Sequence, residues 1–502
     1  MATVTDGQAG ARGAGLGREI LLLGAVVVLG TFMTVLDLTV VNVAIPTLGR
    51  DFSTSISTIQ WVLTGYMLAF ASVIPLTGWA SERFGAKRVW LLSLLLFIAG
   101  SALAGSSWSI GSLIAFRVLQ GLGAGMLMPV GQTILAQAAG PERMGRVMSV
   151  VYVPALLAPV LGPVVGGAIV GNASWRWIFF INLPVGAAAV VARQRLLPEA
   201  KPQLGQRLDL RGLALLSPGI AVFLYGMSEA GNRGGFDSTR TAIALAAGVV
   251  LVALFVWHGI ARGKEALIDL SLFRRRGFAS AAAANLVLGI ALFGSLILLP
   301  LYYQTVRHQS ALDTGLLLAP QGLGVALVMP IAGRLTDTIG ARIVVCVGTI
   351  VALVGTLAYT QVGPHTSYLF LAAALLVIGI GLGSTIMPSM AAAFQALTRE
   401  ETPRGTSALN AIQRIAGAIG TALLAIILQR VIASNVPDFG GGIEGLGSLS
   451  RRPDATAQLA DAFGTTFWVA AGLTAAALVP ALFLPRASPR REEGRTAERP
   501  AA

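Results

Sequence analysis

The chain has 502 residues, of which 55% are hydrophobic and only 12% are charged, with a net charge of +13 and a mean hydropathy of +0.75. Soluble domains carry about 25% charged residues, so this composition excludes an ordinary soluble protein and predicts a polytopic membrane protein. One cysteine, Cys346, excludes an intrachain disulfide and a cysteine metal cluster. Three scattered histidines do not favour a histidine-built metal centre either.

Predominantly apolar runs of roughly 18–28 residues recur along the chain, each long enough to cross a hydrocarbon core of about 30 Å. Because the backbone must satisfy its own hydrogen bonds in lipid, we expect an all-α protein. The pattern predicts fourteen transmembrane helices, over 20–46, 59–80, 88–106, 109–131, 146–170, 174–195, 210–229, 240–261, 277–305, 312–333, 342–361, 367–394, 405–433 and 464–485.

Positive charge predicts the orientation of these helices. With both termini assigned to the cytoplasm, 26 of the 36 Lys and Arg residues fall in cytoplasmic segments, seven in external segments and three inside helices. The net charge of +13 is thus explained by membrane topology, and no nucleic-acid partner is expected.

The sequence repeats itself at a nearly constant offset, which indicates two related halves. The loop Gly78–Arg88 recurs as Gly333–Arg342, and a glycine triplet of the fourth helix recurs in the twelfth (Gly121, Gly123, Gly125; Gly379, Gly381, Gly383). An offset of eight helices predicts two six-helix bundles separated by two inserted helices, the arrangement of a rocking transporter. The expected domains are an N-terminal bundle over 1–196, an insertion over 197–270, a C-terminal bundle over 271–486 and a disordered cytoplasmic tail over 487–502.

Asp37 lies in the middle of the apolar stretch Thr31–Pro46 and is the only acidic residue well inside a predicted helix. Because an ionisable group at bilayer depth costs at least about 2.5–3.5 kcal/mol, Asp37 is a candidate functional residue. Arg117 lies at a matching depth, about 12 Å against about 14 Å below the outer end at 1.5 Å per residue. Burial disfavours the charged carboxylate and an arginine favours it, so this pair could bind and release a proton as its surroundings change. The alternative is a structural ion pair that fixes helix packing.

Two further motifs predict moving parts. In the fifth helix, small residues four apart and two prolines predict a bent, closely packed seam between the halves, against the alternative of ordinary membrane packing. Charged residues of the Gly78–Arg88 loop could pair with helix ends and close the inner side in one state, whereas the alternative is a solvated loop. The seam residues are Pro159, Gly162, Pro163, Gly166 and Gly167, and the gating residues are Gly78, Glu82, Arg83, Gly85, Lys87, Arg88, Asp337 and Arg342.

Soft methionine and aromatic surfaces accommodate varied ligands, and the cavity that we expect between the bundles carries few charges. The alternative for any one methionine is core or lipid packing. The candidate lining residues are Met33, Tyr66, Gln120, Met126, Gln321, Met387, Asn410 and Gln413.

The motifs resemble those of the major facilitator superfamily, and within it the fourteen-span drug:proton antiporters of the EmrB/QacA type. The resemblance rests on Leu36–Pro46, Gln60–Tyr66, Arg117–Gly125, the exporter-type motif Pro159–Gly167, and the loop Gly78–Arg88, which has Glu82 where the superfamily more often has Asp. Gln413-Arg414 departs from the expected order Arg-Gln, so the resemblance gives Arg414 no clear role.

The resemblance implies efflux of lipophilic, often cationic compounds against H⁺ by alternating access, in a bacterial plasma membrane. It implies no cofactor other than the coupling proton, and we expect a monomer in the bilayer.

Other functions are less consistent with the sequence. An ATP-driven pump would need a phosphate-binding G-x-x-x-x-G-K-[ST] loop, which the chain lacks. A membrane enzyme would need a second acid, a histidine cluster or a nucleophile–base pair within the helices, and none is evident. Proton-coupled transport of one specific metabolite or lipid, by export or symport uptake, stays the alternative.

Overall fold

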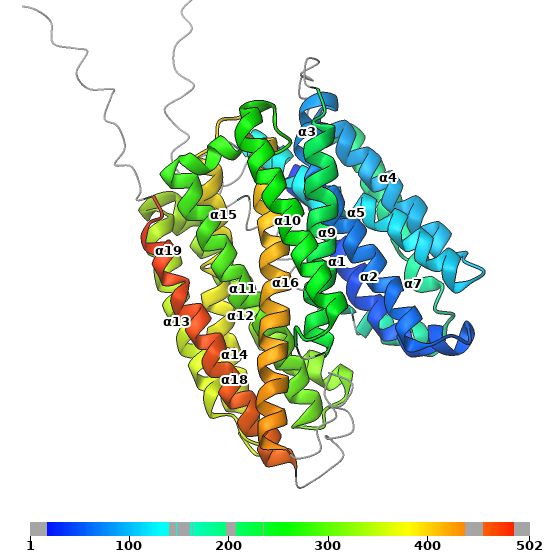
Figure 1. Cartoon of the computed structure of the whole chain (residues 1–502), viewed down its shortest axis with the longest axis vertical. Helices are drawn as coiled ribbons and strands as arrows, with labels where there is room; N and C mark the ends of the chain where they lie inside the picture. Colours follow the sequence, from blue (N-terminus) through cyan, green and yellow to red (C-terminus); the bar gives the residue numbers. More distant parts are fainter. Residues whose placement is uncertain are drawn as a thin grey trace, which may run out of the picture.

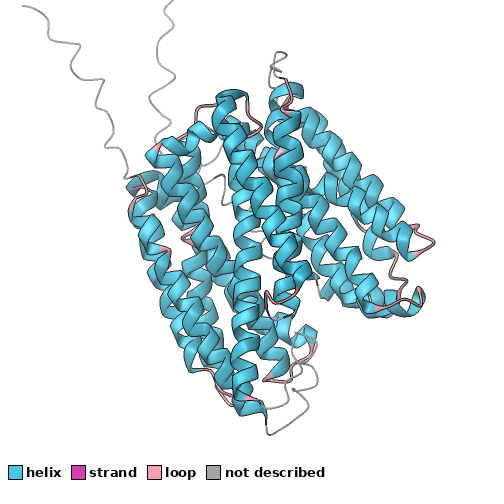
Figure 2. Cartoon of the chain, viewed as in Figure 1, coloured by secondary structure: helices cyan, strands magenta, loops and turns pink. Residues whose placement is uncertain are grey.

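The computed structural model describes residues 18–139, 147, 161–162, 164–196, 207–233, 235–436 and 455–485. Over these ranges the regular structure is helical, without a strand (Figure 2). Eleven of the described helices are long and apolar enough to cross a membrane, or up to twelve when the bent pair α2–α3 counts as one span.

The helices fall into an N-terminal group, an inserted group and a C-terminal group, drawn from blue to red in Figure 1. The N-terminal group contains α1 (Arg18–Asp51), α2 (Ile56–Val73), α3 (Leu76–Phe84), α4 (Ala86–Gly105), α5 (Ile110–Ala139), α7 (Trp177–Phe180) and α8 (Asn182–Leu196). The inserted group contains α9 (Leu210–Arg233), α10 (Thr239–Arg262), η2 (Gly263–Glu265) and η3 (Leu270–Arg274). The C-terminal group contains α11 (Arg276–Thr305), α12 (Ala311–Ile339), α13 (Ala341–Ala358), η4 (Tyr359–Gln361), α14 (Tyr368–Gly383), α15 (Ile386–Gln395), α16 (Thr402–Asn435), α18 (Thr456–Ala476) and α19 (Leu478–Leu482).

The predicted number of fourteen spans is matched in part. The fifth predicted helix, 146–170, lies mostly outside the described residues, as do Pro159, Pro163 and the tail 487–502. The sixth corresponds to α7 and α8, whose apolar stretch Trp177–Ala192 is shorter than the other spans. The second predicted helix is broken at Pro75, where α2 and α3 meet at 55°, because proline has no amide hydrogen to donate within a helix.

Equivalent glycines of the two triplets make equivalent contacts. A Cβ on Gly121 would come within 2.5 Å of the Tyr66 carbonyl oxygen of α2, and a Cβ on Gly379 would collide with the Gln321 carbonyl oxygen of α12. The pair Tyr66 and Gln321 has the same offset of 255 residues as the repeated loops.

The middle glycines pack in the same way on the next helix. Gly123 lies against the backbone of Phe97 in α4, and Gly381 lies against the backbone of Ala352 in α13. The helices therefore approach at backbone distance in both halves, which only glycine permits at these positions.

The turns after α3 and α12 are also alike. Gly85 has φ +84° and Gly340 has φ +90°, a region that residues with a Cβ rarely adopt. Each glycine ends one helix and begins the next, so the two repeated loops have the same backbone conformation.

The inserted helix α9 packs against α10, against α2 of the N-terminal half and against α16 of the C-terminal half (Figure 1). Trp61 of α2 stacks on Tyr225 of α9, with ring centroids 6.0 Å apart. On the other side, Gln429 of α16 donates to the Gly231 carbonyl of α9 over 2.7 Å. The inserted pair thus bridges the two halves.

Asp209 fastens the inserted pair at the end where α9 begins. Its carboxylate accepts from the backbone N–H groups of Gly212 and Leu267 at 3.0 and 3.2 Å and pairs with His258 of α10 at 2.9 Å. Burial alone would raise the pKa of this carboxyl group, but these hydrogen bonds outweigh burial and lower the pKa.

Replacing Gly123 with alanine should destabilise the protein, because the new Cβ would lie 2.5 Å from the Phe97 backbone nitrogen and 2.7 Å from the Ser93 oxygen. Overpacking of this kind costs about 1–3 kcal/mol. Gly472→Ala is the matched control, since a Cβ on this exposed glycine of α18 meets no described atom within 4 Å. We expect a lower thermal midpoint in detergent for Gly123→Ala alone; equal midpoints for both variants would contradict the close α4–α5 contact.

Candidate functional site

Asp37 and Arg117 form an ion pair deep inside the N-terminal half. The Arg117 Nη1 atom lies 2.5 Å from Asp37 Oδ2, and both side chains are fully buried. The pair joins α1 to α5, which are packed against each other. Because removing one partner of a buried pair leaves an uncompensated charge, the two side chains depend on each other for their burial.

Three further contacts fix the guanidinium group. Arg117 Nη1 also donates to Gln120 Oε1 at 2.7 Å, and Arg117 Nε donates to the Val62 carbonyl at 3.3 Å. The Tyr66 ring lies 4.1 Å below the guanidinium carbon, in cation–π geometry. The planar group is therefore held by α2 and α5 together.

The second carboxylate oxygen of Asp37 is held by neutral amides. Gln120 Nε2 donates to Asp37 Oδ1 at 3.0 Å and Asn182 Nδ2 donates to the same oxygen at 3.1 Å. Asn182 Nδ2 also lies 3.1 Å from Ser101 Oγ, which donates to the Phe179 carbonyl at 2.8 Å. A polar chain thus leads from Asp37 into α4 and the α7–α8 junction.

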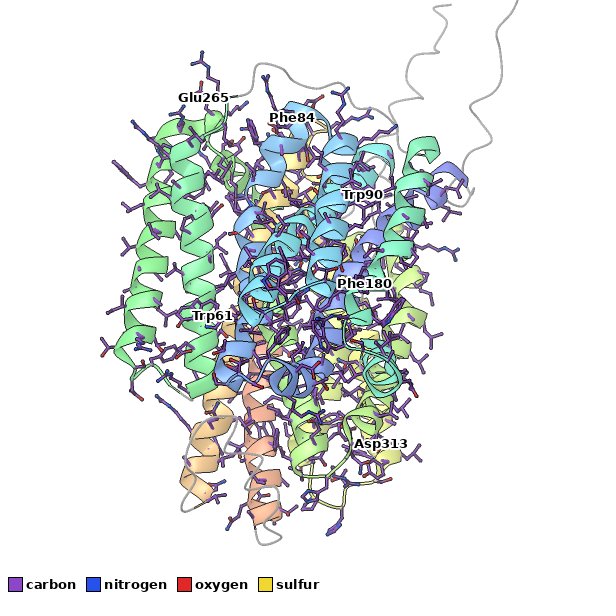
Figure 3. All side chains as sticks on the ribbon, turned by 90° about the vertical axis from the view of Figure 1, so that its right-hand side faces the viewer. Trp61, Phe84, Trp90, Phe180, Glu265 and Asp313 are labelled. Carbon is purple, nitrogen blue, oxygen red and sulfur yellow. The ribbon has the colours of Figure 1, made fainter. Side chains whose placement is uncertain are left out.

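A second buried ion pair joins the two halves near the end of the bundle where Phe84 and Glu265 lie, opposite the end with Asp313 (Figure 3). Arg404 Nε of α16 lies 3.0 Å from both carboxylate oxygens of Glu82 in α3. Arg404 Nη1 also donates to the carbonyl of Lys264, in the connector after the inserted helices. Arg404 therefore links the N-terminal half, the C-terminal half and the insertion.

One face of α16 continues this junction. Ser407 Oγ donates to the Ile74 carbonyl at 2.8 Å, and Asn410 Nδ2 donates to Gln132 Oε1 of α5 at 2.7 Å. A Cβ on Gly78 would lie 3.1 Å from the Arg404 Cα atom, so the helices are in close backbone contact. Because these contacts recur at every third residue, α16 presents a continuous stripe to α2, α3 and α5.

The other charged residues of the predicted gate differ in burial. Arg83, Lys87 and Arg342 are partly buried, and Arg88 is exposed. Asp337 is partly buried and has an interaction partner. Glu82 of the loop pairs with Arg404, which lies in the first turn of α16 and thus at a helix end.

The predicted cavity residues occupy different surroundings. Tyr66 and Gln120 belong to the Asp37 cluster, Asn410 lies in the α5–α16 contact, and Met33 and Met387 are buried in the core. Met126, Gln321 and Gln413 are partly buried. Arg414 adds a cation at the boundary between the halves, with its guanidinium carbon 4.3 Å above the Phe70 ring of α2.

The described part of the fifth predicted helix packs against α1. A Cβ on Gly162 would collide with Thr39, and a Cβ on Gly166 would lie 3.1 Å from the Val40 carbonyl oxygen. Gly167 has no described atom near a Cβ. The contacts at Gly162 and Gly166 lie within the N-terminal half, and Pro159 and Pro163 of the predicted seam lie outside the described residues.

Sequence reasoning did not select Asn182, Ser101 or Arg404. Asn182 is an isolated polar residue in the otherwise hydrophobic stretch Trp177–Ala192. This isolation is the signal by which sequence analysis could find it. Ser101 and Arg404 carried no such signal, because serine is common in membrane helices and Arg404 was placed in a cytoplasmic segment.

The described residues contain no group of three or more His, Cys, Asp or Glu side chains that could hold a metal ion.

Comparisons with known proteins agree with this architecture. The family model of the Major Facilitator Superfamily matches residues 27–421. A multidrug resistance protein B homolog of Mycobacterium tuberculosis (strain ATCC 25618 / H37Rv) is 42% identical over 495 residues, covering 94% of this chain and 92% of that protein. The multidrug export protein EmrB of Haemophilus influenzae is 35% identical over 411 residues, covering 81% and 80% of the two chains.

Solved structures show the same fold at low sequence identity. The human organic anion transporter MFSD10 superposes with a TM-score of 0.58 at 18% identity, covering 91% of this chain and all of that chain (100%). The proton:xylose symporter XylE has a TM-score of 0.59 at 13% identity, covering 93% and 96%.

Two helical halves and a buried carboxylate–arginine pair define a multi-pass transport protein of the bacterial cell membrane. The chain belongs to the Major Facilitator Superfamily, in the drug:proton antiporter branch of the EmrB/QacA type.

Replacing Arg117 with lysine should impair transport although the charge is kept. A point charge cannot bond Asp37, Gln120 and the Val62 carbonyl at once. Losing one charge-assisted hydrogen bond costs about 1.5–3 kcal/mol, equivalent to roughly a ten- to hundredfold decrease in rate. Arg430→Lys, at an exposed position of α16, is the control and should keep its dye-efflux rate. A parental rate in Arg117→Lys would mean that Arg117 only packs.

Replacing Arg404 with alanine should open the junction, because Glu82 is left buried without its partner at a cost of about 3–5 kcal/mol. The readout is maleimide labelling of cysteine placed at the buried Ser81 of α3, next to Glu82, in a Cys346→Ser background. We expect labelling at least about tenfold faster, with no change in the control Arg399→Ala, which lies exposed at the same end. Unchanged labelling in Arg404→Ala would show that the pair does not hold the halves together.

Proposed function

We propose that this protein exports lipophilic, often cationic compounds from the cell in exchange for protons, by alternating access. The observation that carries the proposal is the fully buried Asp37–Arg117 pair in the middle of the long apolar helix α1. A pair that served packing alone could be replaced by apolar side chains at a lower desolvation cost. The relatives from Mycobacterium tuberculosis and Haemophilus influenzae, named as multidrug resistance and export proteins, support drug efflux.

Asp37 and Arg117 are the proposed proton-coupling residues. Arginine and two amides stabilise the ionised carboxylate, while its burial opposes the charge. A small displacement of α5 relative to α1 changes this balance, so one conformation can favour the protonated acid and the other the carboxylate. No cofactor other than H⁺ is part of the proposal.

The proposed gate is the Glu82–Arg404 junction together with Ser407 and Asn410. The positive-inside rule predicts that this end of the bundle faces the cytoplasm, so in this proposal the junction closes the cytoplasmic side. Opening would break a small set of polar contacts along one face of α16 and let the halves rock apart. Fourteen spans, two six-helix domains and cytoplasmic termini are parts of the same proposal, as are substrate-lining roles for Tyr66 and Gln413.

The variant Asp37→Asn should lose proton-driven efflux while remaining folded, because an amide of the same shape cannot take up and release a proton. The test is ethidium uptake into acidified everted vesicles, with expression checked by gel filtration in detergent. Asp313→Asn, at the N-terminus of α12, is the control and should transport at the parental rate. Full uptake by Asp37→Asn, with proton release on addition of ethidium, would remove Asp37 from the mechanism.

The direction of coupling follows from ethidium binding at two pH values. If proton and substrate compete through Asp37, each weakens binding of the other by the same factor, so affinity falls as the pH is lowered. Asp37→Asn should then bind ethidium with little dependence on pH. Tighter binding at the acidic value would instead indicate proton-coupled uptake, the alternative function.

A further inference from the structure

The two oxygens of the Asp37 carboxylate have different partners. Oδ2 faces Arg117 Nη1 at 2.5 Å, and a guanidinium group only donates and stays charged. Oδ1 faces the amide groups of Gln120 and Asn182 at 3.0 and 3.1 Å. Since an ionised carboxylate only accepts, both amides must present their NH₂ groups to it. A proton on Oδ2 would face a fixed cation, whereas Oδ1 faces groups that can also accept.

The two amides differ in their freedom to turn. Gln120 Oε1 already accepts from Arg117 Nη1 at 2.7 Å, so a half-turn of this amide would place its NH₂ group against the guanidinium. Asn182 Nδ2 has Asp37 Oδ1 and Ser101 Oγ as its recorded partners. After a half-turn of the Asn182 amide, its carbonyl oxygen would accept from a protonated Asp37, and the Ser101 hydroxyl could donate to it as well.

We propose that Asp37 takes up its proton on Oδ1 and that Asn182 is the positioning residue that sets the pH at which this happens. Asn182 donates to the carboxylate when Asp37 is ionised and accepts from the hydroxyl when Asp37 is protonated. One proton enters, one O–H bond forms on Oδ1, and Arg117 keeps its charge throughout. The inference rests on the proposed function, in which Asp37 couples transport to protons.

The charged groups around Asp37 do not compete with Asn182 as the acceptor for a protonated Asp37. Arg117 of α5 is the cation in direct contact, Tyr66 of α2 lies under that guanidinium, and Arg414 of α16 acts electrostatically on Tyr66. The elements on the other side, α4 and the α7–α8 junction, contribute the neutral groups of Ser101, Phe179 and Asn182.

Asn182 lies on a different side of Asp37 from the interface between the halves. Helices α4 and α8 pack against α1, α5 and each other, whereas the recorded polar contacts between the halves come from α2, α3 and α5. Asn182, 2% exposed, therefore approaches Asp37 from the side away from the C-terminal half. Protonation can be tuned from this side without altering the surface that faces a substrate.

The test is an infrared pH titration of the reconstituted full-length protein, following the carbonyl stretch of a protonated carboxyl group. The band of Asp37 is the one that disappears in Asp37→Asn. Asn182→Leu should raise the midpoint pH of this band by about one unit, because the charge-assisted bond to the carboxylate is roughly twice as strong as the neutral bond to the acid. The band should also change frequency, since the acid loses its acceptor.

The matched control is Asn285→Leu. Asn285 is buried in α11 and bonds to the Ala281 carbonyl and to Ser389, within the C-terminal half. This variant has the same loss of a buried amide and should leave the Asp37 midpoint unchanged. If Asn182→Leu does not yield folded protein, Asn182→Ala should raise the midpoint and Asn182→Ser, which keeps a hydroxyl, should raise it less.

The outcomes separate the two proposals. A parental midpoint in the Asn182 variants, with the band still lost in Asp37→Asn, overturns the role of Asn182 and leaves Asp37 as the coupling residue. An equal shift in Asn285→Leu also overturns it, because the effect would then be general. If the titrating band persists in Asp37→Asn, no band can be assigned to Asp37. That result would overturn the proposed function itself.

Discussion

The burial of one negative charge governs the design of the N-terminal half. A carboxylate at bilayer depth is tolerated only when donors replace the water that it has lost. Asp37 receives these donors from α5 and α8, and Arg117 is in turn held by the Val62 carbonyl and the Tyr66 ring of α2. Contacts from α2, α5 and α8 thus converge on the Asp37–Arg117 pair, so any relative movement of those helices changes the stability of the charge.

The junction between the halves also depends on a buried ion pair, which lies near one end of the bundle. Glu82 and Arg404 are almost fully buried, and Arg404 also bonds to backbone carbonyls of the connector that follows α10. In the proposed mechanism, opening the junction would rehydrate each of these groups, so their burial in this conformation offsets part of the strength of their mutual contacts. The inserted helices take part in this junction through the connector, and α9 contacts both halves elsewhere. They are therefore structural members of the transporter rather than an attachment to it.

Glycines allow the helices within each half to pack closely against one another. At Gly121 and Gly123, and at their counterparts in α14, neighbouring backbones touch, so each half is a tightly packed unit. Between the halves, polar side chains of α16 supply hydrogen bonds and an ion pair, and Gly78 lies against the Arg404 backbone. Two tightly packed halves that meet at such a junction are suited to the rocking motion of the proposed mechanism.

The sequence alone determined the features that depend on local pattern. Hydropathy over each run fixed the helical class, the offset between repeated glycines fixed the two related halves, and the solitary position of Asp37 marked the site, because these follow from residue type and spacing. Only the tertiary structure decided which side chains from distant segments meet. The partner of Glu82 is 322 residues away in the chain and that of Asp37 in α8 is 145 residues away, and no periodicity encodes such a distance. Helix rotation and depth, set by packing at the glycines, brought Arg404 to Glu82, Asn182 to Asp37, and Gly162 to α1.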